Sequence, residues 1–145
     1  AVSAVLAEVK ERTGNKSIFI THSQGGAVGW DVDVENVSAI IAIEPGGAPQ
    51  VDSDQYKKLL DAKIPIIFYF GDYMENGPQD IMSSGFWSMI KAGAVSFAEA
   101  YNAAGGDATV IDLPAIGITG NSHFMFQEMN NADHIEAWLT EKGLN

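Results

Sequence analysis

Ser17-Ile18-Phe19-Ile20-Thr21-His22-Ser23-Gln24-Gly25-Gly26 is the stretch of this 145-residue chain that decides its fold. An apolar, largely β-branched run ends at Ser23, with small residues two positions away on either side, Thr21 and Gly25. A sharp turn from strand into helix lifts a serine hydroxyl clear of a sheet and holds that serine in a strained conformation. Side chains two positions away would collide with such a turn unless they are small. The pattern therefore predicts a nucleophile elbow of the G-x-S-x-G kind, with Ser23 as the nucleophile.

A base must accept the proton of a serine nucleophile, and histidine titrates in the right range. A serine here also suits the N-cap of a helix, but the small neighbours favour the nucleophile. His22 is adjacent to Ser23 on a strand, so its side chain should point to the opposite face and pack or hydrogen-bond beneath the elbow. His134 falls within a predicted helix and is expected at the surface. His123 follows the last predicted strand, on the sheet edge where Ser23 lies, and is the predicted base.

Two carboxylates stand directly after predicted strands and could orient the imidazole of that base. Glu44 follows the strand next after the elbow, and Asp72 follows the strand after that. Each also has an ordinary interpretation, Asp72 as a turn residue after Gly71 and Glu44 as a loop residue before Pro45. Their spacing alone does not separate the two candidates.

Acyl transfer also needs donors for an oxyanion, and the backbone N–H of Gln24, just after the nucleophile, is the expected first donor. Aromatic and apolar residues after the third predicted strand are most simply core residues, and they are also candidates to line an apolar substrate pocket: Phe86, Trp87, Met89 and Phe124. The three histidines do not form a ligand cluster and the glycine pairs do not match a phosphate loop, so we expect neither a metal nor a cofactor.

Strand and helix patterns alternate along the whole chain. Buried strands are predicted at 17–22, 37–43, 64–70 and 108–113, and helices at 1–13, 24–30, 54–62, 86–104 and 131–142, with a long loop at 74–85. This order predicts a three-layer α/β/α fold with a mostly parallel sheet. No linker or repeat divides it, so residues 1–145 are expected to form a single domain.

The composition is that of a globular protein, 46% hydrophobic and 19% charged. Nineteen acidic residues against eight basic ones give a net charge of −11, which argues against nucleic acid or an anionic membrane as a partner. No apolar run reaches the roughly 18 residues of a transmembrane helix. The charged, helical pattern of residues 1–13 is not that of a signal peptide.

Together these residues resemble the α/β-hydrolase superfamily from the nucleophile strand to the C-terminus. More narrowly, Ile43-Glu44-Pro45-Gly46-Gly47 and Gly120-Asn121-Ser122-His123-Phe124-Met125-Phe126-Gln127 with Asn130-Asn131 resemble a group of bacterial carboxylesterases. The resemblance implies a triad in which the acid is a glutamate on the strand after the nucleophile, hence Ser23, Glu44 and His123, with Asp72 as the alternative acid. It also implies that the chain corresponds to the C-terminal portion of the fold, and that the protein is secreted or periplasmic.

The expected function is hydrolysis of a small-molecule carboxylic ester through an acyl-enzyme. One alternative is a binding or interaction module that keeps the hydrolase scaffold without catalysis. Another is one piece of a two-chain or truncated esterase, inactive without its N-terminal half. The first predicted strand would then be an unpaired apolar edge, so the expected partner is an N-terminal companion segment or chain that completes the sheet.

Overall fold

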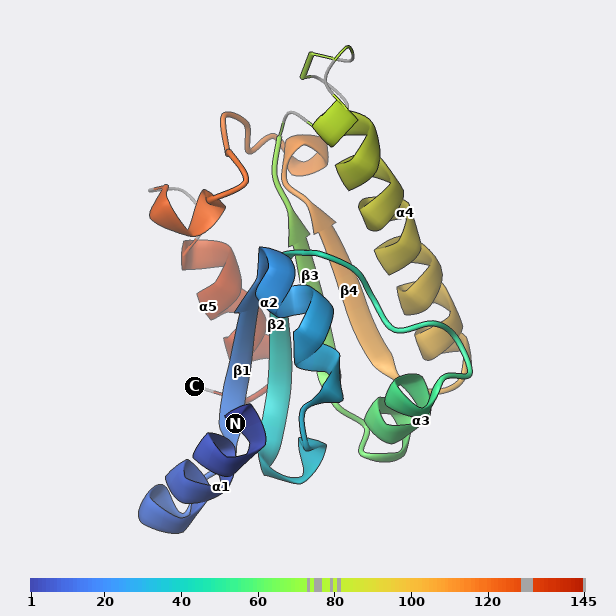
Figure 1. The fold of residues 1–145 in the computed structure, drawn as a ribbon. Coiled ribbons are helices and arrows are strands. Elements are labelled where there is room, and N and C mark those ends of the chain that lie inside the picture. The colour runs from blue at the N-terminus through green and yellow to red at the C-terminus, as the bar shows by residue number, and fades with distance from the viewer. Residues whose placement is uncertain (73, 75–76, 79, 81, 129–131, 145) are drawn as a thin grey trace.

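A four-stranded parallel sheet forms the centre of the computed structural model, which describes residues 1–72, 74, 77–78, 80, 82–128 and 132–144. The strands lie in chain order, β1 (Ser17–His22), β2 (Val37–Pro45), β3 (Pro65–Phe70) and β4 (Asp107–Asp112). The α-helices are α1 (Val2–Thr13), α2 (Ser23–Val28), α3 (Asp54–Asp61), α4 (Met82–Ala103) and α5 (Ala132–Glu141) (Figure 1). Short 3-10 helices lie at Gly29–Asp31, Val34–Asn36, Pro114–Ile116 and Met125–Gln127. The predicted α/β fold with a parallel sheet is confirmed.

The order of the strands determines which face of the sheet each connecting helix covers. Crossovers between parallel strands are right-handed, so strands added in one direction place their connecting helices on one face. Helices α2, α3 and α4 accordingly lie on one side of the sheet and α5 on the other (Figure 1). Two hydrophobic cores result, one around Phe68, Phe97 and Tyr101 and the other around Ile41 and Trp138.

Strand β2 is buried on both faces, as its unbroken apolar run predicts. It continues two residues beyond the predicted end, so Glu44 belongs to the strand itself. Because parallel strands all end at the same edge, the ends of β1, β2 and β3 and the chain after β4 meet there.

Two element predictions need correction. Helix α4 begins at Met82 rather than Phe86, because buried Ser84 donates a hydrogen bond to the Pro78 carbonyl and holds poor helix-forming residues in the first turn. The predicted loop 74–85 is therefore shorter, and its residues 75–76, 79 and 81 lie outside the described residues, as do Asn130–Asn131. Helix α1 buries only Leu6, while its three valines, Val2, Val5 and Val9, stay exposed.

Candidate active site

Ser23 stands at the junction of β1 and α2 in a strained backbone conformation. Its φ angle is +52°, a left-handed value that is unusual for a residue other than glycine. The strain is held by neighbouring backbone, because Ser23 pairs with Pro45 beyond the regular ladder and its carbonyl accepts a 2.7 Å hydrogen bond from the N–H of Gly46. The chain therefore turns from strand to helix at Ser23 with a left-handed backbone, and Gln24 follows as the second residue of α2.

The close approach at this turn occurs at Gly26 rather than at Gly25. A Cβ atom on Gly26 would lie 2.5 Å from the Cβ of Pro45 and 3.3 Å from Thr21 Oγ1. A Cβ atom on Gly25 would meet no described atom within 4 Å. Outside its own helix, Gly25 therefore has room for a side chain among the described residues, and α2 approaches the end of β2 through the next residue along the helix.

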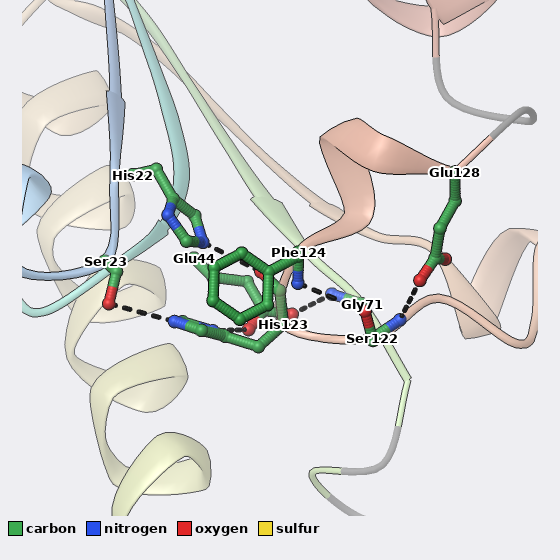
Figure 2. A network of polar contacts seen from close by, with 8 residues as sticks. All are labelled: His22, Ser23, Glu44, Gly71, Ser122, His123, Phe124 and Glu128. Atoms are coloured by element: carbon green, nitrogen blue, oxygen red, sulfur yellow. Dashed lines mark hydrogen bonds and ion pairs between the residues drawn. The ribbon is translucent and has the colours of Figure 1, made fainter.

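His123 lies in the irregular loop that follows β4, and its imidazole faces Ser23. Its Nε2 atom is 2.9 Å from Ser23 Oγ although the two residues are 100 positions apart. Its Nδ1 atom is 2.5 Å from Glu44 Oε2. A carboxylate can only accept, so Nδ1 carries the proton and Nε2 accepts from the serine hydroxyl. Figure 2 shows this hydrogen-bonded series from serine through imidazole to carboxylate.

Glu44 is the buried member of the series, with only 2% of its surface exposed. Its second carboxylate oxygen, Oε1, accepts a 2.8 Å hydrogen bond from the backbone N–H of Gly71. Both oxygens are thus used, as a buried charge requires. The φ angle of Glu44 is +38°, so the carboxylate is aimed from the end of β2 by a strained backbone.

Asp72, the other candidate acid, supports the loop instead. Its Oδ2 atom accepts a 3.1 Å hydrogen bond from the N–H of Gly120, and its own N–H donates to the carbonyl of Asn121 at 3.0 Å. The same short segment after β3 therefore contacts both the carboxylate of Glu44, through Gly71, and the loop that carries His123. The sequence pattern placed a polar residue at this strand end without indicating the role of Gly71.

A cleft of about 360 Å³ opens beside the imidazole of His123. Trp87 of α4 is one wall, and its ring lies 4.4 Å from that imidazole, centroid to centroid. The cleft is lined by Glu44, Asp72, Met74, Pro78, Ser83, Ser84, Trp87 and His123. Of the predicted lining residues only Trp87 is in this set. Phe86, Met89 and Phe124 are about half exposed instead, Phe86 against Trp87 and Phe124 against His123.

The remaining histidines lie as the sequence predicts. His22 is hydrogen-bonded beneath the turn, through its Nε2 atom to the backbone oxygen of His123 at 2.8 Å. His134 is a partly exposed residue of α5. Within the part of the chain that the structure describes, no group of three or more His, Asp or Glu side chains could hold a metal ion. No helix among those residues is long and apolar enough to cross a membrane.

Strand β1 is the outer strand of the sheet and pairs only with β2 among the described strands. Beside it runs an open groove of about 440 Å³ whose lining includes Val2 of α1, Phe19 and Ile20 of β1, and Val28 of α2. Ile20 is 56% exposed and Val28 is 67% exposed. The outer edge of β1 thus presents backbone groups without a strand partner among the described residues, beside an apolar surface.

The fold and the site define the chain as an α/β protein with a serine, a histidine and a carboxylate in hydrogen-bonding sequence at the carboxyl edge of a parallel sheet. Comparison with known structures finds a similar chain in a structure described as that of a novel bacterial esterase, with a TM-score of 0.78 and 28% sequence identity. The similarity covers 99% of this chain and 41% of the esterase, so the chain spans less than half the length of that protein. No family model matches the sequence. No curated protein matches it either. The likeness shows that the two chains share an α/β fold.

Proposed function

We propose that this chain carries the catalytic residues of a serine carboxylesterase. The observation that carries the proposal is the unbroken series from Ser23 Oγ to His123 Nε2, 2.9 Å, and from His123 Nδ1 to Glu44 Oε2, 2.5 Å. The likeness to a bacterial esterase over nearly the whole chain supports the same chemistry. In this proposal Ser23 is the nucleophile, His123 the base and Glu44 the acid.

The reaction follows from the polarity of these contacts. As the Ser23 oxygen attacks the ester carbonyl, its proton passes to His123 Nε2, and the buried carboxylate of Glu44 stabilises the resulting imidazolium. The imidazolium then protonates the leaving alcohol, and the acyl group stays on Ser23. Water, deprotonated by the same Nε2 atom, attacks the acyl-enzyme; the acyl–Oγ bond breaks, the imidazolium returns its proton to Ser23 Oγ, and the carboxylic acid leaves. The backbone N–H of Gln24 is the proposed donor to the oxyanion in both halves of the reaction.

The substrate in this proposal is a neutral or cationic ester, because a net charge of −11 disfavours an anionic one. The cleft beside His123 joins an aromatic wall, Trp87, to the hydroxyls of Ser83 and Ser84. Exposed Phe86, Met89 and Phe124 are proposed to offer further apolar contact to the acyl or alcohol part.

A fluorophosphonate probe tests the proposed nucleophile. It bonds covalently to a serine oxygen only when a base activates that serine, and the adduct appears in the intact mass. We expect one adduct on the wild type, none on Ser23→Ala, and one on Ser83→Ala, which removes an exposed serine of the cleft. The wild type and Ser83→Ala should also hydrolyse a p-nitrophenyl ester, whereas Ser23→Ala should not. Labelling of Ser23→Ala would show that Ser23 is not the nucleophile. A wild type that stays unlabelled and inactive, both as this chain and as the polypeptide isolated from its source, would favour a binding module.

We further propose that a strand from a companion segment or chain pairs with the free edge of β1. Three observations support it: the unpaired edge, the apolar groove beside it, and a span of 41% of the similar esterase. Hydrogen–deuterium exchange over β1 tests it, in this chain and in the polypeptide as isolated from its source. We expect the N–H groups on the side of β1 away from β2 to exchange rapidly in this chain alone. They should exchange slowly in the polypeptide isolated from its source. Equally rapid exchange in both would contradict the companion.

A further inference from the structure

The loop that carries His123 contains no regular secondary structure between residues 118 and 122, so its backbone depends on partners from elsewhere. The N–H of Gly120 and the carbonyl of Asn121 are both bonded to Asp72. The N–H of Ser122 donates to Glu128 Oε1 at 2.9 Å (Figure 2). These three contacts hold the backbone of residues 120–122 in place, but none of them involves the backbone of His123 itself.

That peptide is held by His22. The carbonyl of His123 lies 2.8 Å from His22 Nε2, a contact between residues 101 positions apart. Because a carbonyl can only accept, Nε2 of His22 carries a proton and donates it to this bond. The ring of His22 also packs against His123 and Phe126, at centroid distances of 4.6 and 4.8 Å, which fixes the direction of its Nε2–H.

The contact from His22 matters because His22 directly precedes Ser23 in the chain. His22 is the last residue of β1, and Ser23 follows it directly. One strand end therefore delivers the serine hydroxyl to the imidazole of His123 and a hydrogen-bond donor to the backbone of the same residue. The two contacts, 2.9 and 2.8 Å, together set where the imidazole lies relative to the serine oxygen.

We infer that His22 is a positioning residue for the proposed reaction: it fixes the backbone of His123 so that Nε2 stays within hydrogen-bonding distance of Ser23 Oγ. The inference rests on the proposed function. His22 does not touch the reacting atoms and exchanges no proton with them in this role. Its contribution is geometric, and misplacement of a catalytic group by about 1 Å can cost on the order of 100-fold in rate.

A matched pair of variants tests the inference. His22→Gln keeps an N–H donor at about the reach of Nε2, whereas His22→Met keeps the length of the side chain and removes the donor. We expect kcat for p-nitrophenyl ester hydrolysis to fall about 10- to 100-fold in His22→Met and less than about 5-fold in His22→Gln, with KM nearly unchanged in both. A wild-type kcat in His22→Met would overturn the inference. So would an equal loss in both variants, which would show a packing role alone.

The NMR signal of the proton between His123 Nδ1 and Glu44 gives a readout independent of turnover. A proton in so short a hydrogen bond resonates far downfield while the imidazole is held in place. We expect the signal in the wild type and in His22→Gln, and its broadening or loss in His22→Met. Its persistence in His22→Met would overturn the inference. An inactive wild type that shows the expected NMR pattern would contradict the esterase proposal while leaving the role of His22 standing.

Discussion

Glu44 Oε2 and His123 Nδ1 lie 2.5 Å apart across 79 positions of the chain, and this contact joins the end of β2 to the loop after β4. The carboxylate is almost fully buried and its other oxygen is occupied by the N–H of Gly71. A buried carboxylate with both oxygens accepting is held in one orientation, so the imidazole is held in one tautomer.

The first prediction separates the two candidate acids. In Glu44→Gln one oxygen becomes an NH2 group, which must face either the N–H of Gly71 or Nδ1–H of His123, donor against donor. We expect kcat to fall about 10³- to 10⁴-fold, as when the orienting carboxylate of such a series is neutralised. Asp72→Asn keeps an oxygen for the N–H of Gly120 and should cost less than about 10-fold. The opposite order of losses in steady-state kinetics would reassign the acid to Asp72.

The second prediction concerns Gly71, where a Cβ atom would lie 2.9 Å from Glu44 Oε1 and 3.1 Å from the Asn121 carbonyl. Gly71→Ala should displace the carboxylate and the loop together and lower kcat about 10- to 100-fold. Gly93→Ala, in the exposed interior of α4 where nothing described lies within 4 Å of a Cβ atom, is the control. It should leave kcat unchanged and raise the free energy of unfolding by about 0.5–1 kcal/mol. Unaltered activity in Gly71→Ala would show that the acid needs no such support.

The third prediction compares neighbouring glycines of α2. Gly26→Ala places a methyl group 2.5 Å from the Cβ of Pro45, so we expect a loss of about 1–3 kcal/mol in the free energy of unfolding. Gly25→Ala meets no described atom within 4 Å and should not reduce stability. Urea denaturation measures both. Comparable losses in the two variants would contradict the close approach of α2 to Pro45 at Gly26 alone.

The fourth prediction is a loss of stability in alkali. Burial raises the pKa of Tyr101 from 10.0 to about 12, and its hydroxyl donates to the carbonyls of Leu59 and Ile64 at 2.8 and 2.9 Å. The folded state thus favours the neutral phenol. This stabilisation is complete below pH 10, the pKa when unfolded, and disappears as the pH rises through 12.

Tyr101→Phe is the variant that isolates this effect. It should be less stable than the wild type at pH 8, because the buried carbonyls of Leu59 and Ile64 lose the one hydroxyl that they share. Its free energy of unfolding should then fall less steeply between pH 10 and 12. Some slope should remain, since burial also raises the pKa of Tyr69 to about 12. Equal slopes in denaturant titrations of the two proteins would contradict the assignment.

Much of the fold could be predicted because its signals are local. The unbroken apolar run of β2 is that of a strand buried on both faces, and Ser53 caps α3 as its position before the helix suggests. The start of α4 is predicted four residues too late, because hydrophobic periodicity does not reveal the side-chain hydrogen bond from Ser84 to the Pro78 carbonyl.

By itself the sequence determined the alternation of strands and helices, and hence a parallel sheet whose carboxyl edge gathers Ser23, Glu44, Asp72 and His123. It did so because periodicity and strand ends are properties of short segments. Only the tertiary structure decided which carboxylate contacts the imidazole and that His22 holds the backbone of His123. The ends of adjacent strands lie only about 5 Å apart. The choice between Glu44 and Asp72 therefore depends on the left-handed backbone at Glu44, on the N–H of Gly71, and on a loop whose partners lie far away in the chain.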